Sequence, residues 1–363
     1  MMVTSQAGLE SRGSTYHLRA LATAQFVAAV MIMIRHYMYF TKDTYPLLSK
    51  IAGNINFVEF FFSSSGFLLV IAYRYKVSSI KSFITKRLSR IYPLHVVTAL
   101  FFVMIIITRK LGLFSPKSSG IDNISDLIYH ITLTHSWGFL GRNSLNYPSW
   151  YLSAQFAAYL IFLPALNLLK QGRAWLLAVA MILSFILLEL VSERSSAGHW
   201  TNWTYHFGVA RAVPTFLSGM LLGWYFNTFS RKITSFVPAY FAFSLSMIGM
   251  MTGYFLTISY VILQIALVPL LAAPEVNAKN SFLMSRYAIF LAPLSFPLFL
   301  IHVPVATIVI NFMFHNLTSG KLIGLLVVLT MIIAVGAAAV VHFVLESWHP
   351  LDRFWRRPLV RQS

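Results

Sequence analysis

Ten stretches of this chain are apolar and long enough to cross a lipid bilayer as a helix. The hydrocarbon core of a bilayer accepts about 20 apolar residues in helical form. Inside it, a helix satisfies every backbone N–H and C=O within its own segment. The sequence therefore predicts an all-α, polytopic integral membrane protein. The predicted spans are residues 20–40, 56–73, 92–109, 149–169, 174–191, 207–226, 235–253, 255–273, 288–312 and 322–345.

The composition supports this class. Hydrophobic residues make up 58% of the chain and charged residues only 10%, whereas a soluble domain carries roughly 25% charged residues. The absence of cysteine excludes disulfides and thiolate chemistry. No linker or repeat divides the chain, so we expect one membrane domain over residues 1–363. It would include a cytoplasmic N-terminal segment, 1–17, and a basic cytoplasmic tail, 346–363.

The distribution of Lys and Arg predicts the orientation. With the N-terminus inside, 18 of the 28 basic residues fall in inner segments, eight in outer loops, and two, Arg35 and Arg211, within spans. This excess follows the positive-inside rule and places both termini in the cytoplasm. The net charge of +18 then reflects anionic lipid headgroups. We expect no nucleic acid partner.

His36, in the outer half of the first span, is the strongest candidate for chemistry. An ionisable side chain inside a span is expensive and is a functional-site hypothesis by default. A histidine can act as a general base or acid near neutral pH. Gln25 lies eleven residues earlier on the same helical face, about 16 Å away along the axis. The alternative is an interfacial histidine, with Arg35 reaching the headgroups.

Glu59 begins the second span, on the predicted outer side. It is a second catalytic candidate, because it would orient or polarise His36 of the neighbouring span. The alternative is a carboxylate favoured by the helix dipole. Ser63, Ser64, Ser65 and Gly66 follow it, and such small residues favour close helix packing over nucleophilic chemistry.

Several further residues within or beside spans are candidates for substrate contacts or for structure. Trp150 opens the fourth span, where aromatic residues usually form an interface belt, and Gln155 follows as a neutral hydrogen-bonding residue. Arg211 is a cation that needs a partner, and His302 lies between two prolines that free backbone carbonyls. Glu346 ends the last span and would cap a cationic cluster in the tail. No sequence motif for a metal is present, so we expect none.

Residues 74–90 contain six cations and no acidic residue, and we interpret them as a cytoplasmic loop. Arg87 and Arg90 share one helical face. They adjoin Pro93, which suits the first turn of the third span. Arginine pairs of this kind hold phosphates by charge-assisted hydrogen bonds. The alternative is that these cations only anchor the protein to the membrane surface.

Six segments form an ordered set along nearly the whole chain. In order, they are Gln25 to His36 (first-span motif), Val58 to Phe67 (FFxxSGF), Phe83 to Pro93 (FxxxRxxRIYP), Pro148 to Gln155 with Tyr159 and Pro164 (WSLSxE…Y…P), Leu294 to His302 (SYxxYLxH), and Glu346 with Pro350 (terminal ExP). This ordered set resembles the membrane acyltransferase-3 family of bacterial O-acyltransferases.

The resemblance implies transfer of an acyl group, commonly acetyl, from acetyl-CoA or another acyl-CoA to a sugar hydroxyl. The acceptor would be an exopolysaccharide, an O-antigen, or another glycan or lipid-linked sugar. His36 would be the catalytic base or the residue that handles the acyl group, and Arg87 and Arg90, with Lys86, would lie at the cytoplasmic CoA site. The protein would lie among the lipids of the bacterial plasma membrane and use no metal, and a homo-oligomer is compatible with the resemblance.

Two positions depart from the family pattern. The arginine that the family carries before the histidine is Gln25 here, and its glutamate after WSLS is Gln155. Because of these two changes, a family member with altered catalytic activity is one alternative function. A transporter or flippase of a lipid-linked sugar is the alternative from a different functional class, because proline-interrupted helices are typical of transport sites.

Overall fold

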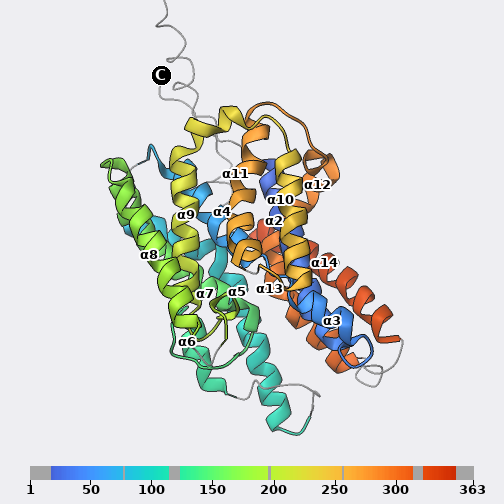
Figure 1. Cartoon of the computed structure of the whole chain (residues 1–363). Coiled ribbons are helices and arrows are strands. Elements are labelled where there is room, and N and C mark those ends of the chain that lie inside the picture. The colour runs from blue at the N-terminus through green and yellow to red at the C-terminus, as the bar shows by residue number, and fades with distance from the viewer. Residues whose placement is uncertain are drawn as a thin grey trace, which may run out of the picture.

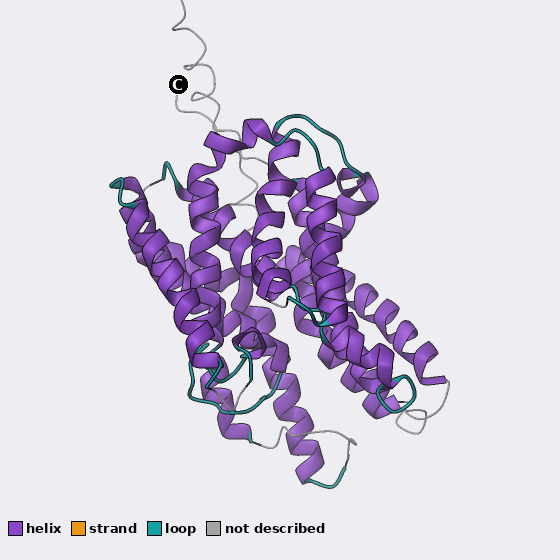
Figure 2. Ribbon diagram, in the orientation of Figure 1, coloured by secondary structure: helices purple, strands orange, loops and turns teal. Residues whose placement is uncertain are grey.

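The computed structural model describes residues 18–76, 78–113, 123–194, 198–255, 257–313 and 322–348. The predicted N-terminal segment, 1–17, and the tail beyond residue 348 lie outside these residues. Within them the chain is helical and has no strand (Figures 1 and 2). The helices are α2 (Arg19–Met38), α3 (Pro46–Gly53), α4 (Val58–Tyr73), α5 (Ile80–Lys110), α6 (Leu127–Ile131), α7 (Trp150–Lys170), α8 (Ala174–Ser192), α9 (Gly208–Phe229), α10 (Val237–Thr252), α11 (Leu263–Val276), α12 (Arg286–Leu291), α13 (Ser295–Ala306) and α14 (Leu322–Trp348).

The prediction of an all-α polytopic membrane protein is confirmed. Eight helical stretches in the described residues are long and apolar enough to span a membrane. The sixth and seventh predicted spans correspond to α9 and α10, which are not among these eight. Helix α10 has only 16 residues, and α9 contains many glycine and polar residues that lower its mean hydropathy. In Figure 1, α8 and α14 lie on opposite flanks of the bundle.

Successive long helices run in alternating directions, so their ends gather on two faces. At one face the backbone N–H of Arg19 donates to Glu275 Oε1 at 2.9 Å, and Lys170 Nζ donates to the carbonyl oxygen of Lys76 at 3.1 Å. We call this the basic face; it lies toward the top of Figure 1. Its helix ends and adjoining turns carry Arg19, Arg74, Lys76, Lys81, Lys170, Arg173, Arg231 and Lys232.

The opposite helix ends form what we call the cavity face. It contains the end of α2, the short helices α3 and α6, and the starts of α4, α7 and α9. Long-range hydrogen bonds fasten its loops, including one of 2.7 Å from the Tyr205 hydroxyl to the carbonyl oxygen of Ser144.

The interpretation of residues 74–90 as a loop is wrong over most of its length. Ser79 caps the start of α5, its hydroxyl accepting from the backbone N–H of Ser82 at 3.2 Å. Residues 80–92 contain neither glycine nor proline, so the helix continues through the basic segment. Pro93 therefore lies inside α5 and not in a first turn.

The break between the seventh and eighth predicted spans is where the sequence suggested it. Helix α10 ends at Thr252, and Gly253 follows with φ 77°, a left-handed conformation that glycine adopts without a steric penalty. Residues Ile258–Ile262 then form a π-helical turn before α11.

Helices α4 and α9 pack backbone against backbone, which confirms the packing role predicted for the small residues of the second span. A Cβ atom added to Gly66 would overlap the carbonyl oxygen of Phe216, and one added to Gly219 would overlap the carbonyl oxygen of Ser63. Small residues permit this approach. The contact fixes the position of Glu59 relative to α9.

Candidate active site

Two histidines from opposite ends of the sequence meet in the bundle. His36, in the last turn of α2, and His302, in α13, have parallel rings whose centroids are 5.0 Å apart. His36 Nδ1 lies 2.8 Å from His302 Nε2. His302 is fully buried. The two rings are therefore in direct hydrogen-bond contact within the apolar bundle, and we call them the histidine pair.

The hydrogen bonds determine which ring nitrogens carry protons. His302 Nδ1 lies 3.1 Å from the carbonyl oxygen of Leu298, which can only accept. Nδ1 of His302 is therefore the donor, and its Nε2 carries a lone pair. That lone pair accepts from Nδ1–H of His36, which leaves Nε2 of His36 as the basic atom of the pair. The arrangement resembles a carboxylate orienting a catalytic histidine, with a neutral imidazole in place of the carboxylate.

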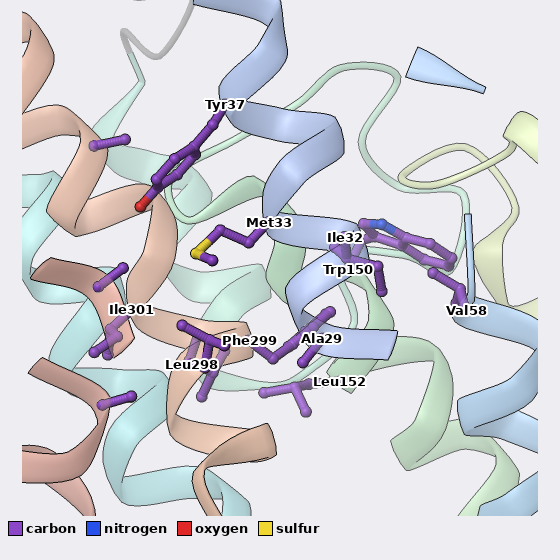
Figure 3. Packing of buried hydrophobic residues seen from close by; sticks show 14 of the residues in the cluster. Ala29, Ile32, Met33, Tyr37, Val58, Trp150, Leu152, Leu298, Phe299 and Ile301 are labelled. Atoms are coloured by element: carbon purple, nitrogen blue, oxygen red, sulfur yellow. The ribbon is translucent and has the colours of Figure 1, made fainter. Parts of the chain in front are cut away.

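The surrounding side chains restrict the movement of both rings. The Tyr37 hydroxyl donates to the backbone carbonyl of His302 at 2.6 Å, and the ring of Tyr147 meets His36 edge-on at 5.0 Å. Figure 3 shows Tyr37 and Met33 of α2 projecting from their helix among buried residues that include Leu298, Phe299 and Ile301 of α13. The histidine pair is thus built on helices whose packing defines its geometry.

A cavity of about 840 Å³ opens beside the pair on the cavity face. Its volume lies within the range of small-molecule sites. His36 and the start of α7 line it, together with polar groups from four loops. The charged residues in its lining are all arginines: Arg35, Arg109, Arg142 and Arg211. The cavity brings a titratable base and positive charge together.

Glu59 does not contact His36 as the sequence suggested. It is completely buried and forms an ion pair with Arg211, whose Nε donates to Glu59 Oε1. The orienting partner of His36 is His302. Arg211 thereby finds the partner that the sequence did not reveal, and its Nη1 also donates to the carbonyl oxygen of Trp203 at 3.1 Å.

Trp150 is also placed differently from the interface belt expected for it. Only 8% of its surface is exposed, and it lines the cavity with the Arg211 guanidinium 5.1 Å from its ring centre. Arg35 lines the same cavity, so its side chain is not directed to headgroups as in the alternative interpretation.

The two glutamines that replace family charges occupy separate polar contacts. Gln25 Nε2 donates to Ser64 Oγ at 2.9 Å, and the backbone carbonyl oxygen of Gln25 accepts from Ser295 Oγ at 3.1 Å. Gln155 is buried and accepts from the Tyr151 hydroxyl at 3.1 Å, while its Nε2 has no hydrogen-bond partner among the residues that the structure describes.

The predicted CoA residues lie in the first turns of α5, whereas Arg109, at the opposite end of the same helix, lines the cavity. The guanidinium of Arg87 is 5.8 Å from the Phe83 ring and 6.0 Å from the Tyr73 ring, and its buried Nε has no hydrogen-bond partner within the described part of the chain. Lys86 is half-buried and Arg90 is exposed. Their role stays a prediction. Ser65 is half-buried on α4. The cap predicted for Glu346 involves the tail, which lies outside the described residues.

A cluster of three buried histidines was missed by the sequence reasoning. His95 of α5 and His130 and His135 around α6 have ligand atoms within 4.8 Å of one another. Their rings are nearly parallel, at 8° to 18°, and His130 and His135 stack at 3.9 Å. Stacked rings do not direct their in-plane lone pairs at one point, so this arrangement fits a hydrogen-bonded packing cluster better than a metal centre. Histidine spacing along the chain offered no signal.

Comparison with known proteins identifies the family. The profile of the acyltransferase domain, the acyltransferase-3 type, matches residues 19–344. The chain belongs to the acyltransferase-3 family. Its histidine pair joins the first and fifth of the six segments that carry the resemblance.

Two relatives match parts of the chain. An acyltransferase, MdmB, of Streptomyces mycarofaciens is 32% identical over 151 residues, which are 39% of this chain and 36% of that protein. An O-acetyl transferase of Shigella phage Sf6 is 28% identical over 178 residues, 47% of this chain and 53% of the phage protein. The matched regions thus cover about half or less of either relative. No solved structure matches the chain.

Proposed function

We propose that this protein is a membrane O-acyltransferase that moves an acyl group, in the simplest case acetyl, from acyl-CoA to a sugar hydroxyl of a cell-envelope glycan. The observation that carries the proposal is the histidine pair beside a cavity that arginines line, in a chain of the acyltransferase-3 family. The relative named an O-acetyl transferase supports acetyl as the group transferred.

The proton chemistry follows from the hydrogen bonds of the pair. Nε2 of His36 accepts the proton of the acceptor hydroxyl while the hydroxyl oxygen attacks the thioester carbonyl carbon. The C–S bond then breaks, and the proton on Nε2 passes to the leaving thiolate. His302 stabilises the positive charge that develops on His36, because its Nε2 lone pair faces the Nδ1–H of His36. A base positioned in this way contributes roughly 10²–10⁴-fold to the rate.

The sidedness rests on the positive-inside rule. The basic face would lie in the cytoplasm of a bacterial cell, at the inner surface of the plasma membrane. Arg87, Arg90 and Lys86 would bind the phosphates of CoA there. The cavity would open toward the outer side and admit the glycan or lipid-linked sugar.

Transfer of radiolabelled acetyl from acetyl-CoA into the glycans of membranes that carry the protein tests the proposal. We expect His36→Ala to lower the rate by roughly 10²–10⁴-fold. His302→Ala should lower it less, and His302→Gln should recover part of the loss, because a glutamine oxygen accepts the Nδ1–H of His36. The matched control is His206→Ala, at an exposed histidine of the cavity face. Wild-type incorporation by His36→Ala would refute the assigned base.

A further inference from the structure

Arg35 is a cation in the cavity wall that has no anionic partner in the part of the chain that the structure describes. It precedes His36 in the last turn of α2, and its side chain lines the same cavity. Its guanidinium offers five N–H donors. The structure gives one long hydrogen bond, from Nη1 to the carbonyl oxygen of Ile55 at 3.4 Å. Among the described residues, no carboxylate lies within 4.0 Å of it.

The neighbouring charges do not neutralise Arg35. Glu59 is paired with Arg211, and Asp126 holds Arg142 at 2.8 Å. In both pairs the arginine lines the cavity and the carboxylate does not. These five side chains together sum to one positive charge, which Arg35 contributes, and Arg109 also lines the cavity. The wall that faces an entering molecule therefore has a net positive charge and includes cationic hydrogen-bond donors among apolar side chains.

An uncompensated charge at this depth is expensive. Charge interactions strengthen as the effective dielectric constant falls inside a protein, and a charge in a membrane-embedded site needs a counter-charge, water or a substrate. A fixed guanidinium recognises carboxylate and phosphate oxygens by paired hydrogen bonds. An acceptor that carries an anionic group would supply the missing counter-charge to Arg35. Its hydroxyl would then lie near His36, the base that removes the hydroxyl proton.

We propose that the cavity binds an oxyanion of the acceptor molecule, with Arg35 as its main cationic contact. The inference rests on the proposed acyl transfer for its biological meaning, and it narrows the acceptor to an acidic one. The oxyanion has two possible sources that share this chemistry. One is the carboxylate of an acidic sugar, and the other is the diphosphate of a lipid-linked sugar.

The position of Arg35 separates this site from the predicted donor site. Gln25 and Arg35 are ten residues apart on α2, about 15 Å along the helix axis. Gln25 itself lies about 1.7 turns from Arg19, where α2 begins at the basic face. Arg87, the predicted phosphate contact of CoA, packs at the basic face on Tyr73, the last residue of α4. Arg35 is thus a contact for the second substrate and lies away from the predicted contacts of the CoA phosphates.

Binding to the purified full-length protein in lipid nanodiscs tests the proposal without any acyl transfer. The probes are sodium glucuronate and inorganic diphosphate, with glucose as the neutral control, all at one ionic strength. The readout is the ligand concentration that gives half of the maximal rise in unfolding temperature. We expect an acidic probe to stabilise the wild type and glucose to have no effect.

Three variants localise the effect. Arg35→Gln should weaken the binding of the acidic probe by at least about tenfold, as expected for loss of a charge-assisted contact. Arg35→Lys, which keeps the charge, should retain part of the affinity and also controls for folding. Arg173→Gln, at the basic face, should bind as the wild type does.

The outcomes decide between sources as well. Stabilisation by glucuronate alone identifies an acidic sugar, and stabilisation by diphosphate alone identifies a lipid diphosphate. If neither probe stabilises the wild type, or if Arg35→Gln binds as well as the wild type, the proposal is wrong. Binding that depends on Arg35 in a protein without acetyl transfer would leave the anion site standing and refute the proposed function instead.

Discussion

The ion pair between Glu59 and Arg211 should be among the most sensitive points of the structure. Only 1% of Arg211 and none of Glu59 is exposed. Replacing Glu59 by glutamine removes the charge and keeps the volume, so Arg211 stays buried without a counter-charge. Breaking a buried pair from one side destabilises a protein by about 3–5 kcal/mol.

The remaining contacts of Arg211 set the expected value within that range. The carbonyl oxygen of Trp203, 3.1 Å from Nη1, and the ring of Trp150, 5.1 Å from the guanidinium carbon, both survive in Glu59→Gln. A desolvated cation–π contact contributes about 2 kcal/mol. We therefore expect Glu59→Gln to lose about 3 kcal/mol, the lower end of the range.

Equilibrium unfolding in mixed detergent micelles, followed by tryptophan fluorescence, measures this loss. The double variant Glu59→Gln with Arg211→Gln places two neutral amides together, and it should be more stable than the sum of the single variants predicts, by at least about 1 kcal/mol. The control Glu193→Gln removes an exposed carboxylate and should change stability by less than about 0.5 kcal/mol. The reasoning is refuted if Glu59→Gln is as stable as this control, or if the single losses simply add.

Two further predictions concern packing and pH. Gly219→Ala should destabilise the protein by about 1–3 kcal/mol, because the new Cβ overlaps the carbonyl oxygen of Ser63; Gly336→Ala, with open space around it, is the control, and equal unfolding midpoints would contradict the close contact. Burial lowers the pKa of His135 to about 3 and that of His130 well below 6.5, so below about pH 6.5 the unfolded chain binds more protons than the folded one. Stability should be complete above that pH and fall as the pH drops toward 4, by at most about 1.4 kcal/mol per pH unit and histidine. Unfolding midpoints at pH 7, 6 and 5 check this, and His135→Gln should decline less steeply; identical slopes would oppose it.

The sequence predicted the class of fold because the membrane imposes a strong local rule. Length and apolar composition identify a spanning helix from its own residues, and Gly253 marked a helix end for an equally local reason. The segment at 74–90 was misinterpreted because its charges suggested a loop. Helix formation there depends on the Ser79 cap and on the lack of a helix-breaking residue, whatever the charge.

The partners inside the site were much harder to predict. His36 and His302 are 266 residues apart, and Glu59 and Arg211 are 152 apart. Each residue was singled out because ionisable groups in spans are rare, but a single sequence holds no information on which of them meet. The pairing depends on how α2 packs on α13 and α4 on α9, and that follows from side-chain shape over whole helices.

Helix α5 is a single element of 31 residues, about 46 Å long, so it exceeds the hydrocarbon thickness of a bilayer by about half. Its first turns carry Arg87, and its last turn carries Arg109, which lines the cavity. A shift of α5 on binding at one end would therefore move a wall of the site at the other end. If a ligand at the basic face favours one position of the helix, it changes the affinity of the cavity for its ligand by some factor. By thermodynamic reciprocity, the cavity ligand then changes the affinity of the basic face for its ligand by the same factor. The two substrates would then regulate each other's binding without sharing a solvent compartment.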